Sequence, residues 1–303
     1  MPELFILSKH VDEYRHLIET VHLPDLNIMT APSAEVDILF GEPDLIRDVL
    51  ATFPALAWVQ ATWAGVEPLL DPALRRDYIL TNARGMFGAL MSEFVFGYLL
   101  LHERKILQRL KAQREQRWDS TLTGTLRGKT IGLLGVGSIG AELARTAKFF
   151  GMTVRGFTRS SEGCPDVDEY FHADLPAFVS KLDYFVSVLP NTAATRHIID
   201  EQVLSALPNH AIFINVGRGS AVDESALVEA LETGAIAGSV LDVLGQEPLP
   251  AGHPLWFAPN TFITSHTSAP SFPQDIARLF IENYRLYAEG KPLKYVVDFE
   301  RGY

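Results

Sequence analysis

The sequence predicts an α/β protein built from two doubly wound parallel-sheet domains. Short apolar, β-branched runs alternate with amphipathic helical stretches, which is typical of a parallel sheet covered by helices on both faces. The alternation occurs in two series, and a long helical stretch separates them. A chain of 303 residues, 47% of them hydrophobic, is long enough to bury a separate core for each series.

The first series fills the first third of the chain. The expected strands are residues 4–7, 37–40, 56–61 and 78–82. Amphipathic stretches between them predict helices at residues 12–21 and 44–52. A long helix is then expected from residue 92 to about residue 118, apolar in its first half and strongly charged from residue 104 onward. Such a helix is long for one domain and could bridge two.

The second series starts at Thr130. A strand that reads IGLLG is followed by a helix over residues 139–150 and a strand over residues 153–157. The later expected strands are residues 184–189, 211–216, 237–242 and 261–264. The last helix is expected over residues 273–289, and a short tail follows it.

Charge and cysteine content exclude several classes of protein. Lys and Arg number 26 against 37 Asp and Glu, a formal charge of −11, which argues against a nucleic-acid or anionic-membrane surface. The densest apolar run, residues 94–101, ends at charged positions and is too short to span a bilayer. The single cysteine, Cys164, excludes an internal disulfide, and the start Met1-Pro2-Glu3 lacks a basic leader, so a cytoplasmic protein is expected. Potential metal ligands do not cluster at a recognisable spacing, so no metal is expected.

A glycine-rich loop predicts a dinucleotide site. Gly135-x-Gly137-x-x-Gly140 directly follows a strand and opens a helix. Gly135 permits the tight turn, Gly137 lets the backbone approach a pyrophosphate, and Gly140 lets the helix pack against the strand. Ser138 and Ile139 are expected to line the dinucleotide, because the helix start offers unpaired N–H groups to phosphate. The alternative is a turn whose small residues serve packing alone.

The stretch GFTRSS favours NADP(H) as the dinucleotide, with NAD(H) possible. It lies about twenty positions beyond the glycine-rich loop, where an acid commonly accepts hydrogen bonds from both ribose hydroxyls. Arg159 and Ser160, with Thr158 and Ser161 beside them, instead offer a cation and hydroxyl donors that suit a 2′-phosphate. The alternative is a surface arginine on a solvated loop.

Three further motifs follow later strands, on the side where open α/β sheets bind ligands. They are NVGRGS at residues 215–220, LDVLGQEPLP at residues 241–250 and ITSHTS at residues 263–268. With the glycine-rich loop, their order closely resembles the D-2-hydroxyacid dehydrogenase family. Other matches are WAGVE (63–67), TNARG (81–85), VLPNTAATR (188–196) and HPLW (253–256). The resemblance therefore spans most of the chain, and VVDFERGY with the TRS stretch resembles the glyoxylate/hydroxypyruvate reductase branch.

This resemblance implies a Rossmann cofactor domain and a flavodoxin-like substrate domain with a cleft between them. Residues 1–97 and 271–303 would form the substrate domain, and residues 98–270 the dinucleotide-binding domain. By the same resemblance the protein would be a homodimer, built largely on the cofactor domain and the long helix.

The resemblance also implies three catalytic residues. Arg218 would clamp the substrate, His266 would be the acid/base, and Glu247 would be the partner of His266. The chemistry agrees with these residue types, because arginine can orient a 2-oxo acid and stabilise its developing alkoxide. Histidine titrates near neutral pH and can serve both directions of the reaction. Each could instead be ordinary: a turn arginine, a surface histidine and an exposed loop carboxylate.

Further residues are assigned to ligands by resemblance. The expected dinucleotide contacts on these loops are Pro190, Thr195, Val216, Gly217 and Asp242. Asp242 would lie near the nicotinamide carboxamide, although a carboxylate at a strand end could also be a cap. The backbone N–H groups of Ala64 and Gly65 would hold the substrate carboxylate and Trp63 would shape the pocket, unless these residues are ordinary core.

Two positions depart from the family pattern. The family commonly reads Thr-Pro-His where this chain has Thr264-Ser265-His266, so one backbone restraint is lost. Gly217 replaces a more usual small side chain before the arginine and is expected to give the backbone room or flexibility near the cofactor.

The function expected from the sequence is NADPH-dependent reduction of a small 2-oxo acid, of the glyoxylate or hydroxypyruvate type, to the (R)-2-hydroxy acid. One alternative is an NAD-dependent dehydrogenase of another D-2-hydroxy acid, such as 3-phosphoglycerate or D-lactate. A phosphorylated substrate would need a basic cluster, and only Arg84 is available for it. The other alternative is a dinucleotide-sensing corepressor or scaffold, against which the intact Arg–Glu–His set argues.

Overall fold

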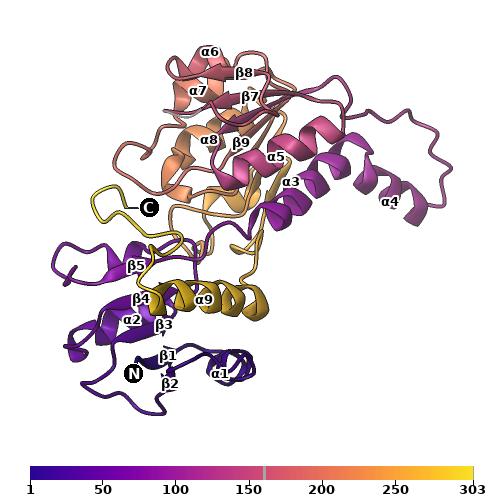
Figure 1. Ribbon diagram of the computed structural model, residues 1–303. Helices are drawn as coiled ribbons and strands as arrows, with labels where there is room; N and C mark the ends of the chain where they lie inside the picture. Colours follow the sequence, from indigo (N-terminus) through magenta and orange to yellow (C-terminus); the bar gives the residue numbers. More distant parts are fainter. Residues whose placement is uncertain (160–161, 303) are drawn as a thin grey trace. The chain divides into compact units, whose positions relative to one another are not determined.

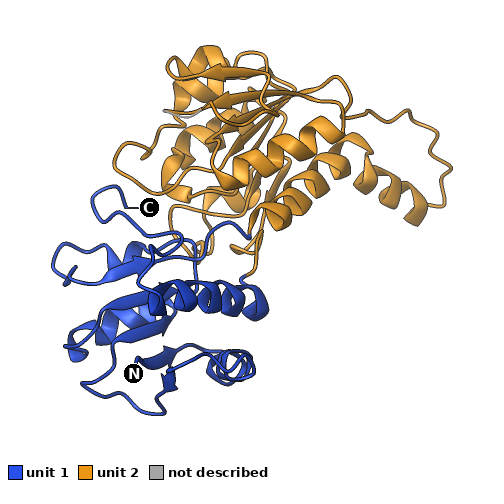
Figure 2. Cartoon of the chain, viewed as in Figure 1, with its two compact units in different colours: residues 1–86, 271–303 blue, residues 87–270 orange. Residues whose placement is uncertain are grey.

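The computed structural model describes residues 1–159 and 162–302, which form two compact units. Unit 1 comprises residues 1–86 and 271–303, and unit 2 comprises residues 87–270 (Figure 2). The predicted boundary after residue 97 falls inside helix α3 (Gly88–Glu103), whereas the two units divide before this helix. The reason is that α3 packs its buried face against the core of unit 2.

Unit 1 is built on a five-stranded parallel sheet with strand order β2-β1-β3-β4-β5. The strands are β1 (Glu3–Leu7), β2 (Asn27–Ile28), β3 (Ile38–Gly41), β4 (Trp58–Ala61) and β5 (Ile79–Thr81). Its helices are α1 (Val11–Glu19), α2 (Pro43–Val49) and α9 (Pro273–Ala288), with short 3₁₀ turns η1 (Leu50–Thr52) and η2 (Glu67–Leu69). This order is the flavodoxin-like form of the doubly wound sheet, as the sequence predicts.

Both faces of this sheet are covered, so β3 and β4 are buried along their whole length. On one face α9, from the end of the chain, packs with α1 (Figure 1). The ring of Phe280 stacks on that of Trp58, with centroids 5.2 Å apart and planes 6° from parallel. The C-terminal helix therefore completes the core that the N-terminal strands begin.

A buried polar network ties the same helix to the sheet. Asn283 on α9 donates from Nδ2 to Oε1 of Gln60 at 3.0 Å. That oxygen also accepts the hydroxyl hydrogen bond of Thr81 at 2.9 Å, and Trp58 Nε1 donates to Thr81 Oγ1 at 2.8 Å. Asn283 Oδ1 accepts the backbone N–H of Lys294 at 2.8 Å. Since the side chains of Trp58, Gln60, Thr81 and Asn283 are fully shielded from water, their polar groups depend on one another for hydrogen bonds.

Unit 2 is built on a seven-stranded parallel sheet with strand order β12-β11-β10-β9-β6-β7-β8. The strands are β6 (Thr130–Leu134), β7 (Thr153–Phe157), β8 (Glu169–Phe171), β9 (Tyr184–Ser187), β10 (Ile212–Asn215), β11 (Gly238–Leu241) and β12 (Thr261–Ile263). The chain starts in the middle of the sheet at β6, builds outward to β8, and then resumes on the other side at β9. The order therefore reverses between β6 and β9, which is the switch point of a Rossmann-type sheet.

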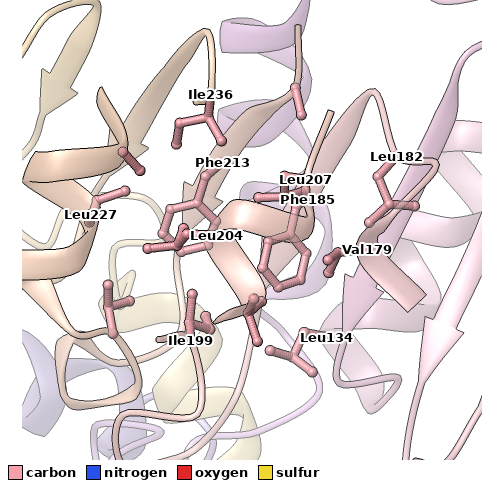
Figure 3. Close-up of a cluster of buried hydrophobic side chains, with 14 of the residues drawn as sticks. Leu134, Val179, Leu182, Phe185, Ile199, Leu204, Leu207, Phe213, Leu227 and Ile236 are labelled. Carbon is pink, nitrogen blue, oxygen red and sulfur yellow. The ribbon is translucent and has the colours of Figure 1, made fainter. Parts of the chain in front are cut away.

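Successive side chains of these strands enter two separate cores. On one face α3 and α5 (Ser138–Phe149) lie side by side and bury Val95 and Leu143 against Ile131 and Ile214 (Figure 1). On the other face Figure 3 shows Phe185 and Phe213 among residues of α6 (Leu175–Val179), α7 (Glu201–Ala206) and α8 (Glu224–Glu232). The 3₁₀ turns of this unit are η3 (Gly219–Ala221) and η4 (Pro254–Phe257). Every strand that the sequence predicts is present, and both doubly wound sheets are confirmed.

The predicted continuous helix from residue 92 to about residue 118 is wrong. The structure has α3 (Gly88–Glu103) and a separate α4 (Ile106–Arg114), both in unit 2, so the helix does not join the two units. Lys105 interrupts the helical ladder with a left-handed backbone, φ 50°. Beyond Arg104 the side chains are almost all exposed, even the apolar Ile106 and Leu107, so no continuous buried face keeps the helix going.

The sequence analysis missed α8 (Glu224–Glu232), a nine-residue helix that buries Leu227, Ala230 and Leu231. The other elements that it does not predict are short. β2 and β8 have two and three residues, and α6 and α7 have five and six. Such lengths are too short for a hydrophobic period to repeat. Across the described ranges, no helix combines the length and the apolar character that crossing a bilayer would require.

Replacement of Asn283 by alanine is expected to destabilise the protein, because Lys294 N–H loses its acceptor and Gln60 loses a donor in a buried setting. The expected loss is about 2–3 kcal/mol in the free energy of unfolding. Urea denaturation followed by tryptophan fluorescence measures it, with exposed Asn209→Ala as the control. Equal stability of N283A and wild type would contradict the importance of this network.

Candidate active site

The predicted site residues of unit 2 lie in loops at one edge of its sheet. All seven strands run parallel, so their carboxyl ends meet at that edge. The glycine-rich loop follows β6, and Arg159 follows β7. Pro190 follows β9, Arg218 follows β10, and Asp242 follows β11. Parallel pairing thus gathers groups that are far apart in the sequence.

Glycine occupies the three positions of the glycine-rich loop for different structural reasons. Gly135 has φ 103°, a conformation that L side chains rarely adopt. A Cβ on Gly140 would lie 2.3 Å from the carbonyl oxygen of Gly135, so only glycine allows α5 to start so close to β6. A Cβ on Gly137 would meet nothing within 4 Å, which leaves open space in front of the first turn of α5.

That open space continues into a hollow of about 450 Å³. Its lining comes from the glycine-rich loop, from the outer face of α5 and from the loop after β7: Val136, Gly137, Ser138, Ala141, Glu142, Arg145, Gly163, Cys164, Pro165 and Asp166. Ser138 is exposed and Ile139 half-buried at the helix start. Backbone N–H groups at a helix N-terminus beside a concave surface are suited to phosphate oxygens.

Arg159 lies two residues beyond the end of β7 and is exposed. Ser160 and Ser161, which the sequence pairs with it, lie outside the described residues. His172 fixes the start of this loop, because its Nδ1 lies 2.7 Å from the carbonyl oxygen of Thr158.

The loop after β9 is held by Thr195, which is 7% exposed. Its hydroxyl donates to the carbonyl oxygen of Pro190 at 2.7 Å and accepts the N–H of Thr192 at 3.0 Å. The Thr195 hydroxyl therefore stabilises the conformation of its own loop. Ser220 links this loop to the next one, because its hydroxyl donates to Oδ1 of Asn191 at 2.9 Å.

Arg218 lies on a turn that is packed tightly on both sides. A Cβ on Gly217 would lie 2.6 Å from the backbone nitrogen of Leu189, and one on Gly219 would lie 1.9 Å from the carbonyl carbon of Leu244. Gly217 is also buried. The room that Gly217 gives the backbone is taken up by the neighbouring loop, whose backbone leaves no space for a side chain. Its predicted contact with the cofactor stays a prediction.

Asn215, which the sequence prediction missed as a site residue, organises the same turn. Its Nδ2 donates to the carbonyl oxygen of Arg218 at 3.0 Å, and its Oδ1 accepts the N–H of Gly217 at 3.2 Å. Arg218 is half-buried, and its Nη1 donates to the carbonyl oxygen of Gly217 at 2.8 Å. The available signal was an amide side chain at the end of an otherwise apolar strand. Val216 beside it is 3% exposed and belongs to the core.

Glu247 and His266 form a direct pair. Oε2 of Glu247 lies 2.8 Å from Nδ1 of His266, and Oε1 accepts the backbone N–H of Leu244 at 2.9 Å. A carboxylate only accepts, so Nδ1 carries the proton and Nε2 is left to exchange one with another group. Both side chains remain partly open to solvent, at 53% for His266 and 38% for Glu247.

Charge and hydrogen bonding shift the pKa of both partners. The hydrogen bond from His266 to the Glu247 carboxylate raises the pKa of His266 above its ordinary 6.5, although burial and the charge of Arg218 oppose this. Burial alone would raise the pKa of Glu247, but its hydrogen bonds with His266 and Leu244 lower the pKa overall. The imidazolium of His266 is therefore favoured, and Arg218 is near enough for its charge to act on both groups.

Asp242 shapes the loop that carries His266. Its buried carboxylate accepts hydrogen bonds from the hydroxyl of Thr264, from the N–H of Thr267 at 2.8 Å and from the N–H of Ser268 at 3.0 Å. These contacts hold His266 between them in a left-handed conformation, φ 56°. The loop has Ser265 where the family commonly has proline, and the Asp242 carboxylate restrains the residues on either side of Ser265 and His266. The contacts of Asp242 are those of a cap, and its predicted role at the carboxamide stays a prediction.

The predicted substrate-binding residues lie in unit 1, after β4. The carbonyl oxygen of Trp63 accepts the N–H of Ala83 at 3.0 Å, and that of Ala64 accepts Nδ2 of Asn82 at 2.7 Å. These two hydrogen bonds fix the loop on the end of β5. Trp63 is 36% exposed, Ala64 is exposed and Gly65 is half-buried, so Trp63 and Ala64 are not core.

Comparison with known proteins agrees with the motifs. Residues 96–268 match the family model described as D-isomer specific 2-hydroxyacid dehydrogenase, NAD binding domain. The chain is 30% identical to glyoxylate/hydroxypyruvate reductase A of Salmonella newport over 253 residues, 81% of each protein.

Solved structures are similar over essentially the whole chain. A D-isomer specific 2-hydroxyacid dehydrogenase family protein from Aeromonas salmonicida is 42% identical with a TM-score of 0.93, covering 98% of this chain and 99% of that one. A D-isomer specific 2-hydroxyacid dehydrogenase from Xanthobacter autotrophicus Py2, in complex with NADPH and MES, is 32% identical with a TM-score of 0.90, covering 100% and 99%. An NADPH-dependent glyoxylate/hydroxypyruvate reductase from Sinorhizobium meliloti, in complex with NADP and sulfate, is 26% identical with a TM-score of 0.86, covering 100% of both chains.

The family match covers more than half of the chain, and the curated relative covers four-fifths of it. The resemblance predicted from the motifs is confirmed. The chain belongs to the D-isomer specific 2-hydroxyacid dehydrogenase family and is an NAD(P)-dependent oxidoreductase.

Proposed function

We propose that this protein reduces a small 2-oxo acid, of the glyoxylate or hydroxypyruvate type, to the (R)-2-hydroxy acid with NADPH. The observation that carries the proposal is the 2.8 Å pair of Glu247 and His266 beside Arg218, on the ligand-binding edge of the unit 2 sheet. The names of the Salmonella and Sinorhizobium relatives support this substrate class.

The loop after β6 fits a dinucleotide. Open space in front of Gly137 leaves room for a pyrophosphate, and the first turn of α5 points N–H groups toward it. The loop after β7 brings a guanidinium, Arg159, rather than an acid, which favours a 2′-phosphate. The NADPH and NADP complexes of the Xanthobacter and Sinorhizobium proteins support this choice. NADPH, when bound, supplies the hydride that reduces the carbonyl carbon.

His266 supplies the proton in this proposal. Its Nδ1 is engaged with Glu247, so the imidazolium presents the Nε2 proton to the ketone oxygen as negative charge develops there. In the oxidative direction the neutral ring accepts that proton at the same nitrogen. Glu247 fixes the ring and favours the charged form, and the carboxylate itself stays ionised.

Arg218 stabilises the substrate in this proposal. Its turn is packed between the loops after β9 and β11, so the guanidinium belongs to a rigid segment. A fixed guanidinium can hold a carboxylate and the developing alkoxide with charge-assisted hydrogen bonds. The substrate contacts of Trp63, Ala64 and Gly65, the cofactor contacts of Pro190, Thr195, Val216, Gly217 and Asp242, and the homodimer stay predictions.

Replacement of His266 by alanine is expected to reduce the rate of NADPH oxidation with the preferred 2-oxo acid by about 10²–10⁴-fold, because the proton donor is lost. The measurement is the decay of NADPH absorbance across a panel of 2-oxo acids. NADPH binding by fluorescence titration should be unchanged, and exposed His16→Ala is the matched control. A fully active H266A would show that another group is the acid, and a wild type without reductase activity would favour the corepressor or scaffold alternative.

The pH dependence follows from the raised pKa of His266. The acid form persists to a higher pH than for an ordinary histidine, so kcat/KM for reduction is expected to fall only as pH rises through a value above 6.5. Glu247→Gln removes the charged acceptor, so this fall should move to lower pH. Oxidation should show the opposite limb, since it needs the neutral ring. If kcat/KM of E247Q falls over the same pH range as that of wild type, the fall reports the titration of a group other than His266.

Arg159→Ala is expected to raise KM for NADPH by about 10–100-fold, the loss of a charge-assisted hydrogen bond to phosphate, with little change for NADH. Steady-state kinetics with each cofactor measures the difference, with exposed Arg285→Ala as the control. Equal losses for both cofactors would refute the 2′-phosphate assignment and favour the NAD-dependent alternative.

A further inference from the structure

A carboxylate outside the predicted site contacts the turn that carries Glu247. Glu224, the first residue of α8, accepts the backbone N–H of Gly245 at Oε1, over 2.7 Å. Gly245 lies two residues before Glu247, and its missing Cβ would touch the Glu224 carboxyl group at 3.4 Å. The carboxylate is thus packed against the turn as well as hydrogen-bonded to it.

The turn is anchored at its start, because Leu244 is 9% exposed and belongs to a core cluster of unit 2. Within the turn, Leu244 N–H donates to Glu247 Oε1 at 2.9 Å, so the Glu247 side chain depends on the backbone path from residue 244 to residue 247. Gly219 packs against the carbonyl group of Leu244 and fixes the start of that path. The middle is a glycine, which has the widest backbone freedom of any residue. The hydrogen bond from Gly245 to Glu224 restrains this flexible point.

Glu224 is itself held in one orientation. Asp223 caps α8 by accepting N–H groups of Ser225 at 3.0 Å and Ala226 at 3.1 Å, which fixes the backbone at the helix start. His253 faces the other carboxylate oxygen, with Nε2 3.6 Å from Oε2. Leu255 N–H donates to Nδ1 of His253, so in the neutral ring the proton lies on Nε2 and points toward Glu224.

We propose that Glu224 is a positioning residue for the acid/base pair: its hydrogen bond to Gly245 holds the turn so that Glu247 stays against His266, and His253 orients Glu224. This inference rests on the proposed function for its catalytic consequence. It assigns chemistry to two residues, Glu224 and the histidine of HPLW, that the motifs alone leave without a role. Glu224 acts through the backbone, whereas the charges that act directly on His266 are those of Glu247, Arg218 and Asp242.

Loss of the hydrogen bond between Gly245 and Glu224 is expected to weaken the contact between Glu247 and His266. Gly245 can then sample other backbone conformations, and the 2.8 Å contact between Glu247 and His266 is populated for less of the time. The pKa of His266 should therefore fall toward its ordinary 6.5. A lower pKa removes the acid form at neutral and higher pH, where reduction needs it.

The chain offers a matched control. Glu201 is also the first residue of a helix and also follows an aspartate N-cap, Asp200, but it is exposed on α7. Glu201→Ala therefore reproduces the loss of a first-turn carboxylate at another helix. Glu224→Gln keeps an oxygen that can accept the Gly245 N–H, while Glu224→Asp keeps the charge and shortens the side chain so that it no longer reaches. Aspartate is favoured in a first helical turn, so E224D is expected to fold even if Glu224→Ala does not.

The direct test is an NMR titration of the histidine ring signals in the protein without added ligands, with H266Q identifying the His266 signal. E224A and E224D should lower the pKa of His266, and E201A should match wild type. E224Q should lower it less than E224D, because its amide oxygen still accepts the Gly245 N–H although its NH2 group meets the Nε2 proton of His253. In the reductase assay, E224D should lose about ten-fold in kcat/KM above the wild-type pKa of His266 and much less below it. KM for NADPH should stay constant.

Each contrary result is distinct. An unchanged His266 pKa in E224D and E224A would overturn the positioning role. A lowered pKa in E224Q with an unchanged pKa in E224D would also overturn it, because the charge and not the hydrogen bond would then be responsible. If the titrations follow expectation but wild type reduces no 2-oxo acid, the positioning role stands and the proposed function fails.

Discussion

Parallel pairing of seven strands is the constraint on which the rest of unit 2 depends. Because every strand runs the same way, the carboxyl ends of β6, β9, β10, β11 and β12 meet at one edge. Each strand is followed there by a loop that carries candidate site residues, from the glycine-rich loop to the His266 loop. The two apolar cores on the faces of the sheet keep these strands aligned. The positions of the site loops therefore depend on the packing of both cores.

Between these loops, close backbone contacts replace side-chain packing. Gly217 and Gly219 bracket Arg218 and allow its turn to touch the loops after β9 and β11. A side chain at either position would clash with the backbone of the neighbouring loop and force the two loops apart. Buried polar groups also fix loop conformations, because Asn215 hydrogen-bonds within the Arg218 turn and Asp242 hydrogen-bonds to the His266 loop. The titratable pair therefore lies on loops whose conformations are fixed by neighbours, which is what a proton donor of defined orientation requires.

The strands could be predicted because each buried run is apolar and bounded by turn residues, and the same holds for the long amphipathic helices. The glycine-rich loop and the Arg, Glu and His motifs could be found because their spacing is local. The break at Lys105 could not, since helix propensity continues through the charged stretch and only the end of core contact stops the helix. The close contact of Gly217 with Leu189 could not be predicted either, because the two residues are distant in sequence.

The sequence by itself determined the class of fold, the family and the chemical types at the site, because hydrophobic period and motif order are properties of neighbouring residues. Only the tertiary structure decided which nitrogen of His266 faces Glu247 and which groups the buried Asp242 carboxylate holds. It alone also distinguished Glu224 from Glu201, two acids in the same local context. Hydrogen bonds between loops depend on where separate strands end in space, and no local pattern records that.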